Sequence, residues 1–482
     1  MLTALSDKKI FWLATGLFLL TAVYFTVLQI FWIYLLPAAL LVILASLFRM
    51  DLVFFLTVLI VPLSINFDET PLGFGINVPT EPITFGLMLL MIFKIIMEGG
   101  IDKRILRHPV SILILLHLLW MMVCTVTSSL PLVSFKYTLA RFSFVTVFYF
   151  YGIQLFTRAK NISKFAWFYI ISLMIVIVYT TYNHAINFFS EAAAHSAMTP
   201  FYYDHTQYAA MIAMFLPLVI ATLFGSEFSK PTKTVALFAL LLLSTGLVLS
   251  YTRAVWVGVT AALLCSFIFI FRVHTSLVWA AIVTFLVLGS INISNIILNL
   301  ETNKETSSTD FASHLLSVTN IKTDASNTER INRWSCAVRM FQQRPLTGWG
   351  PGTYQFIYGS FQLNSELTII STSHGNLGNS HSEYLGPLSE EGLPGALFFI
   401  GIAIATIITA SQFIVNSKSK KLRALAIGLI LGMIAYWVHG FVNNFLHTEK
   451  ASIPFWGFIG AIVALRIYHQ DDAVENKTSV GF

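Results

Sequence analysis

IFWLATGLFLLTAVYFTVLQIFWIYLLPAALLVILASLF, residues 10–48, decides the class of this protein. The stretch contains no acidic or basic side chain. A transmembrane helix needs about 20 consecutive apolar residues, so the run is long enough for two spans. The rest of the chain agrees: of 482 residues, 56% are hydrophobic and only 11% are charged, and the mean hydropathy is +0.76. This composition predicts an all-α polytopic membrane protein.

Hydropathy along the whole chain predicts fourteen candidate spans, with a true number between 12 and 14. The weakest candidates are the short segment 52–66 and the first two, which share the run quoted above. The predicted ranges are 10–29, 30–48, 52–66, 82–97, 109–128, 137–157, 165–189, 206–224, 234–251, 254–271, 276–298, 393–415, 424–446 and 452–468.

Basic residues predict the orientation, because short cytoplasmic loops retain Lys and Arg. With the N-terminus inside, nineteen of the 29 basic residues fall on the cytoplasmic side. The short outer connections hold only Lys136, Arg141, Arg253 and Lys450. We therefore expect a multi-pass membrane protein, with both termini cytoplasmic and the large loop extracytoplasmic.

Four regions follow from this topology. Residues 1–298 are predicted to form a transmembrane bundle of about 11 helices, and 299–392 an extracytoplasmic loop containing short helices. Residues 393–468 supply three C-terminal spans, and 469–482 form a cytoplasmic tail. The three cysteines are scattered without metal-type spacing, so we expect neither a metal site nor a disulfide framework.

The long loop is where chemistry is expected. Its first part, 301–327, is polar and reads as irregular, and a helix is predicted over 327–342. The apolar stripe of that helix would comprise Ile331, Trp334, Val338 and Phe341. The segment RPLTGWGPGTY, residues 344–354, follows as a tight Gly/Pro turn region with aromatic side chains.

The loop closes on NSHSEYL, residues 379–385. Ser380 and Glu383 have the spacing of a capping box, with Ser380 as N-cap. That arrangement places His381 in the first turn of a short helix, where the helix dipole favours a neutral imidazole. A histidine in such a place either serves as a base or simply hydrogen-bonds backbone.

The same residues resemble a known family. Nine residues separate His381-Ser382 from Gly392-Leu393-Pro394-Gly395. This pattern is similar to the H-[NSQ]-x9-G-x-x-T signature of O-antigen ligases. The wider family includes O-antigen polymerases and bacterial O-oligosaccharyltransferases. Gly395 stands where the ligase signature has Thr, a departure that weakens the ligase assignment without weakening the family.

Further segments extend the resemblance over roughly residues 200–465, whereas the first 200 match in hydropathy alone. The matching segments are Arg330-x-x-x-Trp334 with Pro345–Gly352, Ser250–Trp256 and, more loosely, Tyr203–Ala209.

The resemblance implies a glycosyltransferase of the bacterial cytoplasmic (inner) membrane that uses no cofactor, with the large loop periplasmic. The sequence has no Asp-x-Asp pair and no clustered His and carboxylates, so we expect the enzyme to be metal-independent. His381 would be the general base, since imidazole has a suitable pKa for taking a proton from an acceptor hydroxyl. Arg253 would bind the donor diphosphate, because guanidinium pairs bidentately with phosphate oxygens, although a snorkelling interfacial arginine is the ordinary alternative. Arg141 and Arg330 are further candidate diphosphate ligands, with an ion pair and a solvated helix face as their respective alternatives.

Three more residues are candidate sugar or acceptor contacts: His205, Trp349 and Tyr384. Aromatic side chains at a membrane interface are expected in any such protein, so the two aromatic candidates depend on the resemblance.

The predicted reaction is an inverting transfer of a glycan from undecaprenyl diphosphate, most simply to lipid A–core as in an O-antigen ligase. A polymerase of O-antigen or exopolysaccharide and a protein O-oligosaccharyltransferase are alternatives, with a glycan or a protein as acceptor. Membrane lipids are expected partners and nucleic acid is not. A transporter or flippase of lipid-linked glycans is the alternative from another class; its substrate site would lie near the bilayer midplane, where these spans carry almost no charge.

Overall fold

The computed structural model describes residues 7–27, 34, 36–67, 75–271, 276–277, 280, 284, 325–367, 371 and 378–470. The chain divides into two units, Met1–Phe54 and Phe55–Phe482, and each is described by itself. The first unit contains α1 (Asp7–Val27) and α2 (Leu36–Phe48). Large apolar side chains of α1 such as Leu20 and Val27 are exposed, as expected for a helix in lipid.

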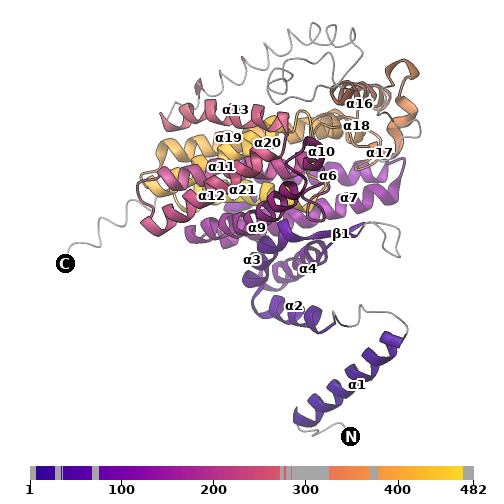
Figure 1. Ribbon diagram of the computed structural model, residues 1–482, viewed down its shortest axis with the longest axis vertical. Coiled ribbons are helices and arrows are strands. Elements are labelled where there is room, and N and C mark those ends of the chain that lie inside the picture. Colours follow the sequence, from indigo (N-terminus) through magenta and orange to yellow (C-terminus); the bar gives the residue numbers. More distant parts are fainter. Residues whose placement is uncertain are drawn as a thin grey trace, which may run out of the picture. The chain divides into compact units, whose positions relative to one another are not determined.

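The second unit is a helical bundle (Figure 1). Its long helices are α4 (Thr80–Glu98), α6 (Pro109–Val126), α9 (Ala159–Ile186), α11 (His205–Phe224), α12 (Lys230–Leu249), α13 (Arg253–Ile270), α19 (Gly392–Asn416), α20 (Lys420–His439) and α21 (Glu449–Tyr468). These nine are, within the described residues, the helices long and apolar enough to cross a membrane. The prediction of an all-α polytopic membrane protein is confirmed.

Shorter elements complete the fold. They are α3 (Met50–Ile60), η2 (Val61–Leu63), β1 (Ile65–Phe67), β2 (Ile76–Val78), α5 (Lys103–Leu106), α7 (Pro131–Phe144), η3 (Val145–Tyr151), α8 (Gly152–Leu155), α10 (Glu191–Ala194), α16 (Ala325–Gln343), α17 (Tyr354–Ile357), η4 (Tyr358–Phe361), η5 (Asn364–Glu366) and α18 (Leu385–Glu390). The strands form an antiparallel hairpin in which Asn66 pairs with Asn77. Helices α7 and α8 are joined through the π-helical turn η3, so 131–155 is continuous helix.

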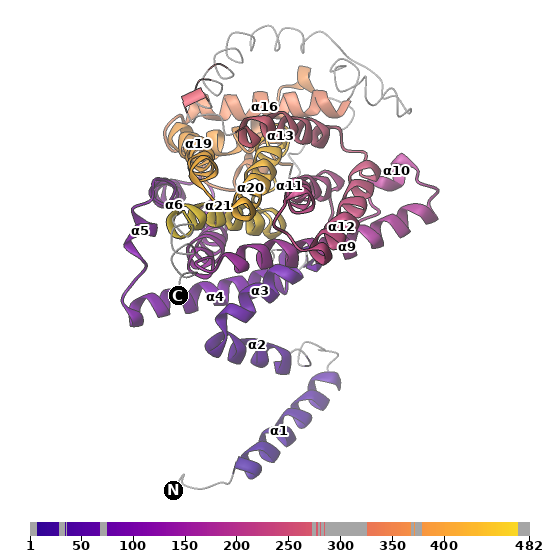
Figure 2. The same cartoon turned by 90° about the vertical axis from the view of Figure 1, so that its left-hand side faces the viewer.

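Helices α20 and α21 lie in the interior of the unit, and α12 lies at its periphery (Figure 2). Glycines allow the inner helices to approach closely, as is common between membrane helices. A Cβ on Gly432 of α20 would lie 2.0 Å from the Met214 carbonyl oxygen of α11. A Cβ on Gly258 of α13 would lie 2.6 Å from the Ala435 carbonyl oxygen of α20. The inner helices therefore fix the positions of the residues at their ends.

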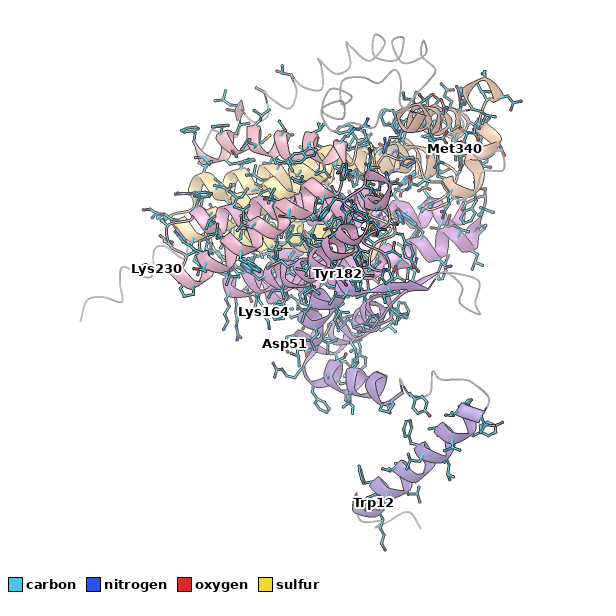
Figure 3. The ribbon with its side chains drawn as sticks, in the orientation of Figure 1. Trp12, Asp51, Lys164, Tyr182, Lys230 and Met340 are labelled. Carbon is cyan, nitrogen blue, oxygen red and sulfur yellow. The ribbon has the colours of Figure 1, made fainter. Side chains whose placement is uncertain are left out.

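One end of the unit carries α16, α17 and α18, and we call it the loop end. Met340 lies at this end, whereas Lys164 and Lys230 lie toward the other (Figure 3). Helices that begin at the loop end include α11, α13, α19 and α21. Helices that finish there include α6, α12 and α20. This agrees with the sequence prediction that their connections share one side of the membrane.

Several predicted boundaries need correction. The predicted span 424–446 stops early, because α20 finishes at His439 and residues 440–448 form a non-helical connection to α21. The predicted span 137–157 begins earlier, at Pro131, a residue suited to the first turn of a helix. Most of the predicted span 276–298 and of the irregular segment 301–327 lies outside the described residues, as does most of the 469–482 tail.

Candidate functional site

Two loop segments, 344–354 and 385–393, pack against each other through their backbones. The Gly350 amide donates to the Glu390 carbonyl at 2.8 Å, and the Trp349 amide donates to the Ser389 carbonyl at 3.1 Å. The Leu393 amide donates to the Pro345 carbonyl at 2.9 Å. The Gly/Pro turn region is thereby held on α18 and the start of α19.

The glycines of these segments have no room for a side chain. Gly392 has φ +71°, and a Cβ there would lie 2.0 Å from the Leu346 carbonyl oxygen. Gly348 has φ +62°, and its Cβ would lie 2.3 Å from the Glu390 carbonyl carbon. Positive φ and close backbone approach are the two conditions that require glycine. The buried Glu390 carboxylate accepts from the Tyr354 amide at 2.9 Å, and burial raises the pKa of Glu390 to about 8.

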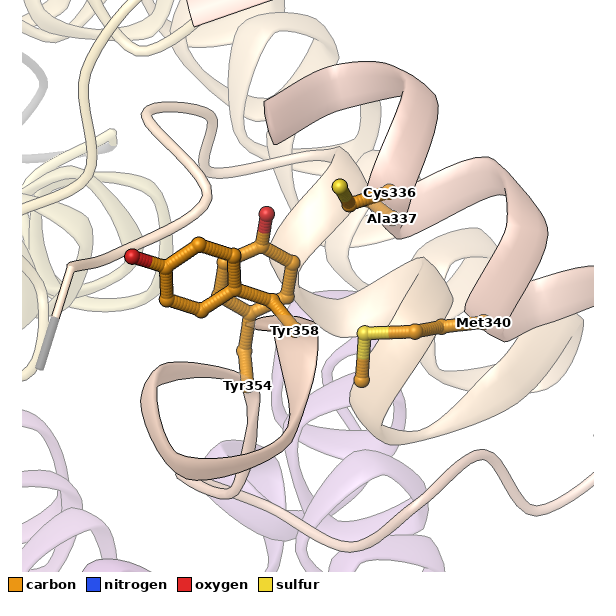
Figure 4. Packing of buried hydrophobic residues seen from close by; sticks show 5 residues of the cluster. All are labelled: Cys336, Ala337, Met340, Tyr354 and Tyr358. Atoms are coloured by element: carbon orange, nitrogen blue, oxygen red, sulfur yellow. The ribbon is translucent and has the colours of Figure 1, made fainter. Parts of the chain in front are cut away.

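Helix α16 lies over these segments on a small apolar core of Cys336, Ala337, Met340, Tyr354 and Tyr358 (Figure 4). The two tyrosine rings stack with centroids 5.2 Å apart. The helix predicted over 327–342 is confirmed, but its predicted stripe is wrong. Val338 of that stripe is exposed, and the buried face is turned toward Cys336 and Met340 instead.

Ion pairs and hydrogen bonds of two arginines hold α16 against the surrounding loop. Arg339 pairs with Glu366 at 2.6 Å and also donates to the Phe361 carbonyl at 2.7 Å. Arg333 donates to Glu329 at 2.9 Å and to the Asn379 carbonyl at 3.1 Å. Arg333 therefore holds the chain just before His381.

His381 lies in a tight turn rather than in the first turn of a helix. It has φ +48°, in the left-handed region, and α18 begins only at Leu385. The His381 amide donates to the Asn379 side chain at 3.1 Å, and the Trp334 indole donates to the His381 carbonyl at 3.3 Å. The predicted capping box, with Ser380 as N-cap, is thus wrong. Helix α18 begins at Leu385, and it is the Ser382 hydroxyl that accepts from the Leu385 amide, at 3.3 Å.

Glu383 does not cap a local helix with Ser380, as its spacing suggested, but binds groups of the 440–448 connection and α20. Its buried carboxylate accepts from the Tyr436 hydroxyl at 2.7 Å and from the amides of Phe445 and Leu446 at 2.6 and 2.9 Å. The Glu383 amide also donates to the Gly440 carbonyl at 2.8 Å. Burial raises the pKa of Glu383, and these donors oppose that rise. Glu383 therefore ties the His381 turn to the 440–448 connection.

The imidazole of His381 is half-buried and lies near the side chain of Asn443. The Asn443 amide nitrogen lies 3.3 Å from Nε2 of His439. Burial and the nearby Arg330 and Arg333 lower the pKa of His381 to about 3. Near neutral pH His381 is therefore uncharged, with a lone pair on one ring nitrogen.

The structure brings His205 and Arg330 into the same region. Arg330 acts electrostatically on His381, on His205 and on His439. Asp204, the N-cap of α11, also acts on His381 and lies 3.7 Å from Nδ1 of His205. These side chains come from α11 and its N-cap, α16, the His381 turn and α20. Segments far apart in sequence therefore meet at one place.

Arg253 begins α13 after a three-residue connection, as the sequence predicts. The preceding Thr252 hydroxyl lies 3.5 Å from the His205 carbonyl oxygen. Further along, Gly258 of α13 packs against Ala435 of α20, about one turn before His439. Arg253 is therefore at the level of the His439 end of α20, at the loop end.

Arg141 of α7 is buried, with 9% of its surface exposed. Its guanidinium donates to the Tyr137 hydroxyl at 3.0 Å and lies 5.9 Å from the Trp456 ring. Within the described part of the chain, no carboxylate lies within the 4.0 Å of an ion pair. The predicted alternative for Arg141, a structural ion pair, is thus not found among these residues.

Trp349 and Tyr384 are engaged in packing. Trp349 donates to the Met340 carbonyl at 3.0 Å and contacts Phe361 edge to face. Tyr384 donates to the Trp437 carbonyl at 3.0 Å and stacks on Phe441 at 4.3 Å. These contacts give both rings a structural role, and their contact with sugar stays a prediction.

Residues 238–400 match a protein-family model described as O-antigen ligase. Over these residues the chain is similar to the O-antigen ligase family. The matched region runs from α12 into α19 and contains Arg253, Arg330 and His381. The resemblance inferred from the motifs is confirmed for this region. No curated protein sequence matches the chain.

The departure from the family signature at Gly395 has a local cause. A Cβ on Gly395 would lie 2.3 Å from Cβ of Glu391 and 2.7 Å from its Oε2. That oxygen lies 2.7 Å from Nε2 of His117, and both side chains are buried. Gly395 thus leaves the space that the His117–Glu391 pair occupies.

We expect Gly395→Thr to destabilise the protein. The added atoms would overpack the site and displace Glu391 from His117, at a cost of about 1 to 3 kcal/mol. Thermal denaturation in detergent measures the loss. Gly401→Ala is the matched control, because its Cβ would meet only Leu113 at 3.6 Å. Equal midpoints for wild type and Gly395→Thr would contradict this explanation.

Some site residues gave no signal in the sequence. Asn443 is polar and close to the end of a predicted span, but nothing in its neighbours indicated contact with His381. Within the described residues, no group of three or more His, Cys, Asp or Glu could hold a metal ion. Metal independence stays a prediction.

Proposed function

We propose that this protein is an inverting glycosyltransferase of the bacterial cytoplasmic membrane. The donor is a glycan on undecaprenyl diphosphate, and the acceptor hydroxyl enters at the loop end, which faces away from the cytoplasm. Both chain termini are cytoplasmic. The family match supports action on lipid-linked glycans, and the donor, acceptor and stereochemistry are our additions.

The burial of the Arg141 guanidinium is the observation that supports a diphosphate as the bound group. A buried cation is costly unless an anion compensates it. The described residues provide Arg141 with a tyrosine hydroxyl and aromatic rings, and the carboxylates of Glu383 and Glu391 act on it only from beyond ion-pair distance. A bound diphosphate supplies the missing charge, and guanidinium binds phosphate oxygens bidentately.

His381 is the general base in this scheme. Its neutral ring holds one lone pair, and its turn is fixed by Asn379 and Trp334. A positioned base of this kind contributes to the transfer only in its uncharged form. Binding of a diphosphate offsets the charge of Arg330, which raises the pKa of His381 toward a value suited to accepting a proton.

The reaction balances without a further reactant. The acceptor oxygen attacks the anomeric carbon from the side opposite the diphosphate, its proton passes to His381, and the carbon–oxygen bond to phosphate breaks. The negative charge that develops on the leaving diphosphate is stabilised by Arg141, Arg253 and Arg330. Attack from the opposite side inverts the anomeric centre.

Replacing Arg330 by Met should move the pH dependence of the reaction. Arg330 lowers the pKa of His381, so its removal raises that pKa from about 3 toward the ordinary value. Since the base must be uncharged, activity is lost as pH falls through this pKa. The acid limb of kcat/KM therefore shifts to higher pH in the variant. Profiles from pH 4 to 8, each normalised to its own maximum, measure the shift.

Arg344→Met is the control for this prediction, because Arg344 is not among the charges that act on His381. Its acid limb should stay where the wild-type limb lies. If Arg330→Met leaves the limb unchanged, the group that titrates in the reaction is not His381.

The proposed function is tested with purified protein in nanodiscs supplied with an undecaprenyl-diphosphate glycan. Release of free undecaprenyl diphosphate is followed with lipid A–core, with a second lipid-linked glycan, and with a Ser/Thr-containing protein. Release that depends on lipid A–core supports an O-antigen ligase, which we expect. Dependence on the second glycan indicates a polymerase, and dependence on the protein indicates an O-oligosaccharyltransferase. Movement of the intact donor across the bilayer without release would instead indicate a flippase.

A further inference from the structure

A shallow basin of about 440 Å³ lies at the loop end, beside the point where α6 finishes. Its lining comprises Thr127, Arg344, Pro345, Leu346 and Thr347. The lining contains none of the proposed diphosphate ligands Arg141, Arg253 and Arg330.

Arg344 is the only charged residue in this lining, and its position is fixed. Its guanidinium lies 4.1 Å from the centre of the Trp349 ring. Trp349 is itself held by its bond to the Met340 carbonyl and by the edge of Phe361. Among the described residues the Arg344 side chain forms no hydrogen bond or ion pair. Stacking engages the face of a guanidinium and leaves the donors in its plane for a ligand.

The surroundings of the basin place it at the depth of lipid headgroups. Val126, the last residue of the membrane-spanning helix α6, is 84% exposed. Leu132 and Leu346 are 74% and 67% exposed. Exposed apolar side chains beside a stacked cation, at the end of a span, fit the boundary between acyl chains and headgroups.

We propose that this basin binds the phosphate headgroup of an anionic phospholipid from the leaflet at the loop end. The Arg344 guanidinium and the Thr347 hydroxyl donate to the phosphate, and Leu346 contacts the first carbons of the acyl chains. This inference does not depend on the glycosyl-transfer reaction.

The consequence of such binding is mechanical. Arg344 and Leu346 belong to the segment 344–354, which backbone hydrogen bonds hold against residues 385–393. A lipid bound at Arg344 therefore anchors both segments to the membrane surface. A soluble anion would supply the charge but would leave Leu346 in water, which is why a lipid is the better ligand.

Native mass spectrometry of protein extracted from nanodiscs tests the proposal. Phosphatidylglycerol is titrated against a phosphatidylcholine background, and retained phosphatidylglycerol is counted for wild type, Arg344→Gln, Arg344→Lys and Arg158→Gln. We expect about tenfold weaker retention at one site in Arg344→Gln, the size of one charge-assisted hydrogen bond. Arg344→Lys should retain part of the affinity, because a point charge replaces the bidentate donor.

Arg158→Gln is the matched control, since Arg158 is an exposed arginine at the start of α9, away from the loop end. Equal retention in wild type and Arg344→Gln would overturn the proposal. So would displacement of the lipid by inorganic phosphate or by an acidic oligosaccharide at equal molar concentration, since the basin would then be a site for soluble anions. Circular dichroism confirms folding, and if Arg344→Gln unfolds, Arg344→Lys carries the comparison.

Discussion

His381→Gln is expected to lower the rate of glycan transfer by roughly 10²- to 10⁴-fold, the contribution of a positioned general base. Gln keeps a polar side chain of similar size, but it has no basic nitrogen lone pair to take the acceptor proton. Binding of the donor should change little, because the diphosphate is assigned to arginines. The measurement is acceptor-dependent release of undecaprenyl diphosphate, with donor affinity determined separately.

His195→Gln is the matched control. His195 is an exposed histidine at the loop end, and its Nδ1 lies 3.2 Å from Nδ1 of His205. Its replacement should leave the rate within a few-fold of wild type. If His381→Gln transfers glycan at the wild-type rate, another group is the base. If it loses donor binding in proportion to the rate, His381 is a donor ligand instead.

The membrane class and most helices could be predicted because each span records its environment in its own residues. Helix α13 and the short connection before it follow directly from an apolar run and the position of Arg253. Helix α20 shows the limit of this reasoning. The span predicted from its hydropathy continues to Leu446, but the helix finishes at His439. The Glu383 carboxylate from another segment binds the amides of Phe445 and Leu446, and no local pattern reports that contact.

In the candidate site, too, local sequence features could be predicted and tertiary contacts could not. The motif around His381 was visible in the sequence, whereas the local geometry inferred from it was wrong, because a capping box is a prediction from spacing alone. Glu383 satisfies distant backbone amides, and Trp334 and Asn379 fix a left-handed turn at His381. These are tertiary contacts between segments far apart in the chain. Sequence spacing cannot distinguish them from a local cap.

Arg141→Met should have opposite effects on function and on stability. Met is close to Arg in length and apolar, so it removes the buried charge while it continues to fill the space beside Tyr137 and Trp456. We expect donor binding to weaken roughly 10- to 100-fold through loss of charge-assisted hydrogen bonds. Without donor, the variant should be more stable by about 1 to 4 kcal/mol, the range found when buried ion pairs are replaced by apolar side chains of similar volume. Thermal denaturation and donor titration measure the two effects.

Arg339→Met provides the contrast within the same chain. Arg339 pairs with Glu366 at 2.6 Å, so its loss leaves a partly buried carboxylate without its partner and should lower the thermal midpoint. The two arginines therefore predict shifts of opposite sign for the same substitution. Added donor should raise the midpoint of wild type more than that of Arg141→Met, because ligand stabilises the folded state in proportion to its affinity. A lower midpoint for Arg141→Met without donor would mean that the charge is compensated inside the protein, and the argument for a diphosphate at Arg141 would fail.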